Sequence, residues 1–159
     1  MRKLSIFLLI IIIAVGLLAC KNDEISVNFY YCSEYPSYYN NELILQSETR
    51  TLGTPLSDLE SLLSAYLDGP YNVLLRSPFP KGTKLVSVQP GKEMIEVVLS
   101  DEFATLEGIN LTLACACISN TLLEISNAEM IRIRTESVPL ANTEYIDMTQ
   151  KSLLSFVSS

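Results

Sequence analysis

The side chains of this chain that could most readily take part in chemistry are four thiols and a few adjacent carboxylates. The clearest pair of neighbouring carboxylates is Asp101 and Glu102, and the thiols belong to Cys20, Cys32, Cys115 and Cys117. Histidine is absent from the whole sequence. Its absence excludes Ser-His-Asp and Cys-His catalysis and any zinc site with histidine ligands.

Two of the thiols, Cys115 and Cys117, lie two residues apart in a segment that we expect to be helical. Residues at that spacing point to different sides of a helix, so the pair is poorly placed to share a metal ion or to form a bridge. We therefore expect buried, unreactive thiols. The alternative is a disulfide from Cys32 to either of them, which an environment outside the cytoplasm would permit.

The neighbouring carboxylates are better explained by local structure than by catalysis. A general acid and a general base must converge in a pocket. Asp101 and Glu102 are neighbours on an expected loop, whereas Asp58 and Glu60 stand at an expected helix start, where acidic residues complement the helix dipole. The sequence predicts no catalytic residue, no metal site and no cofactor.

Five of the eight tyrosines fall between positions 30 and 39. Exposed aromatic rings can stack on sugars or anchor a protein partner. This clustering makes Tyr30, Tyr35, Tyr38 and Tyr39 a candidate surface for a partner or a glycan. The alternative is a strand and its turn that cover one edge of the core.

The first twenty residues have the organisation of a secretory signal. A short basic head precedes an uncharged run over 4–19, which as a helix would reach only about 24 Å, against about 30 Å for a hydrocarbon core. The sequence LLAC at 17–20 then resembles the lipobox of bacterial lipoproteins, although Leu18 is bulkier than the usual residue. The resemblance implies cleavage before Cys20 and lipid on its thiol, where two acyl chains give stable anchoring.

The composition of the remaining chain, residues 20–159, fits one domain of ordinary size. Without Arg2 and Lys3 it has nine basic against 18 acidic residues, a net charge of −9. Such a charge argues against nucleic acid as a partner and against electrostatic adhesion to an anionic membrane. Contact with a membrane would therefore depend on the lipid at Cys20.

Hydrophobic periodicity predicts seven elements in the order β-β-α-β-β-α-β. Ser57 and Glu60 have the spacing of a capping box at the start of the first helix. Interspersed strands and helices favour an α+β fold, with a mixed or antiparallel sheet and two helices packed on it. The expected strands are 25–32, 42–52, 84–88, 93–99 and 129–135, and the expected helices are 57–67 and 109–125. Residues 137–159 form a C-terminal extension to which the sequence assigns no structure.

Several short motifs occur in the order found in a known family. They are FYY at 29–31, LDGP at 67–70, SPFPKGTKL at 77–85, VLSDEF at 98–103, NTLLEI at 120–125 and MIRI at 130–133. Over about residues 26–136 the chain resembles the GerMN domain, named for a sporulation and germination lipoprotein of spore-forming bacteria. It departs from the family at Glu136 and Ser137, where the last strand often ends in glycine, and it has one copy where the founding protein resembles a tandem pair.

The resemblance implies a lipid-anchored, non-enzymatic interaction or assembly module on the outer face of the cytoplasmic membrane, linked to sporulation or germination. Its expected partner is an envelope protein or a second copy of the chain. The alternative is a module that binds peptidoglycan or another glycan. A wall hydrolase is the third hypothesis, and the missing histidine disfavours it.

Overall fold

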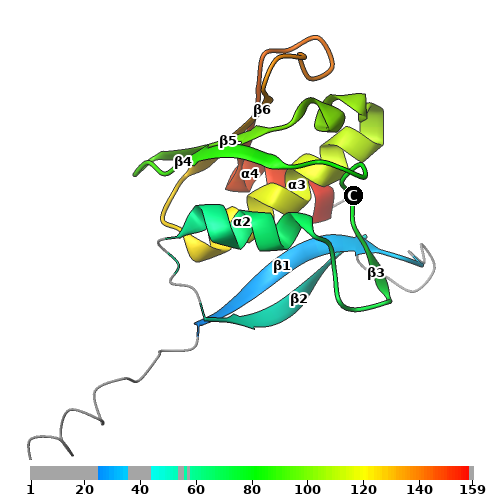
Figure 1. Ribbon diagram of the computed structural model, residues 1–159, viewed down its shortest axis with the longest axis vertical. Helices are drawn as coiled ribbons and strands as arrows, with labels where there is room; N and C mark the ends of the chain where they lie inside the picture. The colour runs from blue at the N-terminus through cyan, green and yellow to red at the C-terminus, as the bar shows by residue number, and fades with distance from the viewer. Residues whose placement is uncertain (1–24, 36–43, 54–55, 57, 158–159) are drawn as a thin grey trace, which may run out of the picture.

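The strands of this protein form two sheets. The computed structural model describes residues 25–35, 44–53, 56 and 58–157, and it is shown in Figure 1. Sheet A has the order β2-β1-β3 and is antiparallel throughout, whereas sheet B has the order β4-β5-β6-β7. The strands are β1 Ile25–Ser33, β2 Leu45–Leu52, β3 Leu75–Arg76, β4 Leu85–Gln89, β5 Met94–Leu99, β6 Met130–Thr135 and β7 Ile146–Thr149.

Three α-helices and one short 3₁₀ helix complete the described chain. They are α2 Leu59–Leu67, α3 Gly108–Ile125, α4 Gln150–Val157 and the 3₁₀ helix η1 Asp101–Thr105. The α+β class and the expected order of elements are confirmed. The strands divide between two sheets, however, where one was expected. The two-residue strand β3, the strand β7 and the helix α4 had no counterpart in the prediction.

Sheet B is mixed, because β5 and β6 run parallel while its other pairs are antiparallel. Parallel neighbours need a crossover connection, and α3 provides it. The C-terminal extension contributes the last strand of this sheet, since β7 pairs with β6 from Ile146 to Thr149. Met148 and Leu153, from β7 and α4, are buried in the core.

Helix α2 presents Leu62, Leu63 and Tyr66 to the core. The side chain that caps its start is Asp58, whose Oδ1 accepts a hydrogen bond from the Ser61 N–H at 3.1 Å. The capping box predicted at Ser57 is therefore wrong by one position, and Ser57 itself lies outside the described residues. Both residue types suit this role, and the backbone conformation at the helix start selects between them.

Helix α3 lies between the two sheets (Figure 1) and contacts both β1 and β6. By length and composition it is apolar enough to cross a membrane, but half of it is buried inside the protein. Its wide apolar surface is explained by contacts on more than one side. Its buried residues are Leu111, Ala114, Cys115, Ala116, Cys117, Ile118, Ser119, Thr121 and Leu122.

An aromatic cluster joins α2 to sheet A. The ring of Tyr66, which is fully buried, lies 5.1 Å from that of Phe29, 5.0 Å from that of Tyr31 and 5.2 Å from that of Phe79. Phe79 in turn lies 6.5 Å from Phe103, which is fully buried. One face of β1 therefore packs against α2 through these aromatic rings.

Candidate functional site

The edge of β1 is closed by two side-chain hydroxyls. Among the described residues β3 pairs only with Cys32 and Ser33, so no described strand lies beside the edge of β1 at Tyr30. There the Tyr30 N–H donates to Thr121 Oγ1 at 3.0 Å, and the Tyr66 hydroxyl donates to the Tyr30 carbonyl at 2.5 Å. The Thr121 hydroxyl also donates to the Cys117 carbonyl, in the preceding turn of α3, at 3.0 Å. A strand edge satisfied in this way cannot accept another chain at this point.

Of the four tyrosines of the predicted surface, the structure describes Tyr30 and Tyr35. Tyr30 is half-buried on the face of sheet A opposite the aromatic cluster. Burial, and a hydrogen bond and charge from Glu124, raise the pKa of Tyr30 to about 12. Tyr35 follows the end of β1 and is 73% exposed. Tyr38, Tyr39 and the predicted lipid-anchor residue Cys20 lie outside the described residues.

An exposed apolar surface surrounds the end of β1, and we call it the distal patch. The Glu34 N–H donates to the Leu74 carbonyl, and the Ser33 N–H donates to the Ile44 carbonyl, both at 2.8 Å. These bonds bring the loop before β3 and the start of β2 to the same end of sheet A (Figure 1). The distal patch consists of Tyr35, Ile44, Val73 and Leu74, which are exposed by 73%, 38%, 86% and 59%.

A buried ion pair fixes the loop that carries the distal patch. Arg50 Nε lies 2.5 Å from Glu48 Oε1, and the two side chains are only 6% and 11% exposed. The Arg50 guanidinium donates to the Gly69 carbonyl at 2.6 Å and lies 3.8 Å from the centre of the Tyr71 ring. The Glu48 carboxylate accepts from the N–H groups of Tyr71 at 2.9 Å and Asn72 at 2.6 Å. The loop that follows α2 is thus bound to β2 at Gly69 through Arg50, and at Tyr71 and Asn72 through Glu48.

The electrostatics of Glu48 follow from these bonds. Burial alone would raise the pKa of its carboxyl group, but the hydrogen bonds from Arg50, Asn72 and Tyr71 outweigh burial and lower the pKa from its ordinary 4.5. The carboxylate is therefore the form that the fold prefers. Its role is to hold the loop beneath the distal patch.

The carboxylates considered in the sequence have structural surroundings. Asp101 Oδ1 accepts hydrogen bonds from the N–H groups of Ser137 at 2.9 Å and Val138 at 3.1 Å. Glu102 is exposed, and a hydrogen bond from Ser100 lowers the pKa of its carboxyl group. Within the described residues, no three His, Cys, Asp or Glu side chains lie close enough together to hold a metal ion.

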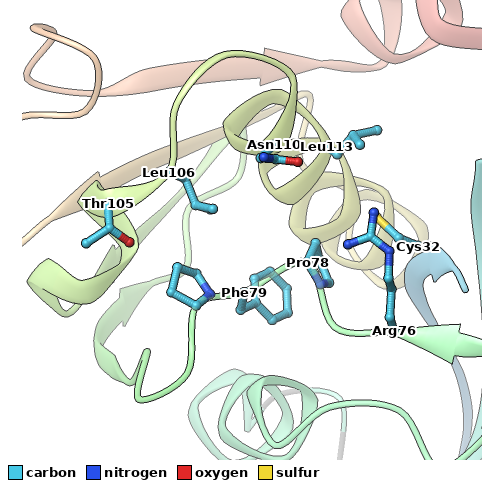
Figure 2. A pocket seen from close by; sticks show the side chains of 9 residues that line it. Cys32, Arg76, Pro78, Phe79, Thr105, Leu106, Asn110 and Leu113 are labelled. Atoms are coloured by element: carbon cyan, nitrogen blue, oxygen red, sulfur yellow. The ribbon is translucent and has the colours of Figure 1, made fainter.

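Three of the four thiols lie in the described chain, and all three are buried and free. Cys32 nevertheless forms part of the wall of a pocket of about 310 Å³. Figure 2 shows its sulfur beside the side chain of Arg76, with Pro78 and Phe79 on one wall and Asn110 and Leu113 of α3 on the other. Cys115 and Cys117 do not line this pocket.

Comparison with known proteins places these features in a family. Residues 28–141 match the Germane family, whose description is sporulation and spore germination. This chain belongs to the Germane family. Its matched span begins within β1 and includes both sheets up to β6. The resemblance to the GerMN domain that the sequence indicated is confirmed.

The fold of this Germane domain is similar to that of solved structures. It matches the first GerMN domain of the sporulation protein GerM from Bacillus subtilis with a TM-score of 0.61 and 17% identity, covering 80% of this chain and 98% of that one. It matches the tandem GerMN domains of the same protein with a TM-score of 0.61 and 18% identity, covering 81% of this chain and 47% of that one. At these identities the likeness concerns the fold. Among curated protein sequences, none matches this chain significantly.

Sequence reasoning missed the distal patch and the ion pair below it. Val73 and Leu74 belong to a loop with no regular period, so no pattern of residues indicated their exposure. The partnership of Glu48 and Arg50 at a spacing of two on one strand was visible, because residues i and i+2 share a face. Only the fold shows that this face of β2 is covered by α2 and by the loop that follows it.

Proposed function

We propose that this chain is a non-enzymatic interaction module, held at the outer face of the cytoplasmic membrane by lipid on Cys20, that docks a protein partner in the cell envelope through its distal patch. Membership of the Germane family supports a role in sporulation or spore germination. The signal-like start and LLAC at 17–20 support the lipid anchor.

The position of the distal patch carries the proposal. β1 has nine residues, so its two ends are about 26 Å apart at about 3.3 Å per residue. The chain enters β1 at Ile25, and the five peptide steps from Cys20 to Ile25 span at most about 18 Å. An anchor at Cys20 would therefore keep the start of β1 within about 18 Å of the bilayer, whereas the distal patch lies at the other end of the strand. Exposed apolar side chains at that end of the strand fit contact with a protein partner.

Photo-crosslinking in membranes of the sporulating host tests this proposal. A photoreactive residue at Val73, in the full chain, is expected to give a discrete crosslinked product. The matched control is the same residue at Ile109, which is 64% exposed on α3. A product with twice the mass of the chain would identify a second copy as the partner. Equal products from both positions, or none from Val73, would contradict docking through the distal patch.

A glycan-binding module is the second candidate, favoured by the exposed ring of Tyr35 in the distal patch. Titration of the full chain with purified peptidoglycan distinguishes the two. Saturable binding that is lost on Tyr35→Ala, together with no crosslinked protein from Val73, would replace the first proposal. Cleavage of peptidoglycan that is lost on Asp101→Asn or Glu102→Gln would instead indicate an enzyme.

A further inference from the structure

Cys32 and Cys117 face each other at the end of a regular series of contacts between β1 and α3. Asn28 Nδ2 donates to Glu124 Oε1 at 2.5 Å, and the Tyr30 N–H donates to Thr121 Oγ1 at 3.0 Å. Two further residues along the strand, about 6.6 Å, correspond to roughly one further turn of the helix, about 5.4 Å. That step brings Cys117 opposite Cys32, and each thiol influences the pKa of the other.

The two thiols differ in access. Both are buried, but Cys32 lines the pocket shown in Figure 2 and Cys117 does not. Of the two thiols, Cys32 is therefore the one nearer to a small molecule in the pocket, with 1% of the residue exposed. Arg76, at the same wall of the pocket, is exposed and has no ion pair among the described residues. A cation in this position favours molecules that carry carboxylates.

The surroundings also give the Cys32 and Cys117 thiols different pKa values. The hydrogen bond with Cys117 and the charge of Arg76 lower the pKa of the Cys32 thiol to about 7, although its burial acts in the opposite direction. Burial raises the pKa of the Cys117 thiol. Cys32 therefore has the larger fraction of thiolate, which is the nucleophilic form. Cys115 is also buried, and its pKa is raised to about 12 by that burial.

We propose that Cys32 and Cys117 form a thiol–disulfide exchange site that reacts with small anionic disulfides and closes into an intramolecular disulfide. The Cys32 thiolate attacks one sulfur of the incoming disulfide, whose S–S bond breaks and releases one thiolate, which takes up a proton. Cys117 then loses its proton to solvent and attacks Cys32 Sγ, which releases the second thiolate. Two protein thiols are oxidised and one external disulfide is reduced to two thiols. The product joins the end of β1 to α3.

Reaction of the reduced full chain, purified in detergent, with oxidised glutathione tests the proposal. Peptide mapping is expected to find a bond between Cys32 and Cys117, and the melting temperature should rise by roughly 5–15 °C because a long loop is closed. Cys117→Ser should stop at glutathione bound to Cys32. Cys115→Ser is the matched control and should form the bond as the wild type does. Arg76→Gln should slow the reaction with oxidised glutathione but not with cystamine, a cationic disulfide.

The wild-type map decides the question even if a cysteine variant fails to fold. The proposal is overturned if the folded wild type leaves Cys32 unreacted under conditions in which the unfolded chain reacts. It is also overturned if the bond found joins Cys32 to Cys115, or if Cys117→Ser accumulates no glutathione on Cys32.

Discussion

The Thr121 hydroxyl accepts a hydrogen bond from the Tyr30 N–H at 3.0 Å and so joins α3 to an edge of β1 that has no neighbouring strand at that point. Tyr66 satisfies the carbonyl of the same residue. Side chains of α2 and α3 thus make the hydrogen bonds that a longer neighbouring strand would otherwise make with Tyr30. The edge of β1 is therefore not free at this residue.

Replacement of Thr121 by valine tests this closure. Thr121→Val keeps the shape of the side chain but leaves the partly buried Tyr30 N–H without an acceptor, so we expect a loss of about 1–3 kcal/mol in the free energy of unfolding. Urea denaturation measures it. The control is Thr112→Val on the same helix, where the hydroxyl bonds only to the Gly108 carbonyl. Equal effects at the two positions would show that the contact with Tyr30 contributes nothing.

The ion pair below the distal patch should contribute to stability in a pH-dependent way. Glu48→Gln leaves the buried Arg50 charge unpaired, and we expect a loss of about 3–5 kcal/mol at pH 7. The pKa of Glu48 is lowered in the folded state, so this stabilisation is complete above the unfolded pKa, near 4.5, and declines as the pH falls through the folded value. Denaturation curves of both proteins between pH 7 and pH 3 should therefore converge.

The surface pair of Arg132 and Asp147 provides the contrast for that measurement. Its side chains are 25% and 30% exposed, so Asp147→Asn should cost only about 0–1 kcal/mol. If Asp147→Asn were as damaging as Glu48→Gln, the burial of the Glu48–Arg50 pair would not be the cause of its importance.

Leucine truncation distinguishes the core from the distal patch. Leu63→Ala and Leu122→Ala remove side chains that are 1% and 0% exposed, and each should destabilise the fold by roughly 2–5 kcal/mol. Leu74→Ala, at a position 59% exposed, should lie within about 0.5 kcal/mol of the wild type. A stability loss at Leu74 as large as at Leu122 would assign the distal patch to folding rather than to binding.

The lipid anchor is tested at Cys20. Cys20→Ala removes the only side chain at the proposed cleavage site that can form a thioether, so the variant should remain uncleaved and incorporate no labelled lipid. Metabolic labelling followed by gel electrophoresis measures both. The control is Cys32→Ala, which should be cleaved and labelled normally. Lipid on the Cys20→Ala protein would refute the anchor.

Local periodicity was sufficient for most elements of this fold. The helix expected at 109–125 is α3 at Gly108–Ile125, and the strand expected at 25–32 is β1 at Ile25–Ser33. In both elements the apolar residues of the buried face recur at a regular spacing along the sequence. β3 has two residues and β7 has four, which is too short for a period to show.

The division into two sheets could not be predicted, because it depends on distant contacts. Tyr30 and Thr121 are 91 positions apart, and nothing in either segment specifies the other. The distal patch was hidden for a similar reason. It forms because the backbone of Glu34 meets that of Leu74, and backbone bonds between loops leave no pattern of side chains.

The late position of Thr121 in the chain has a consequence for the order in which the protein folds. The hairpin of β1 and β2 joins neighbouring segments of the chain, so it can form within microseconds. Helix α3 must emerge later and close a long loop before it reaches β1. Until then the backbone of Tyr30 is available to any passing strand. If the chain is exported as proposed, it would therefore pass through an interval of vulnerability to aggregation, whose length is set by the speed of translocation rather than by its final stability.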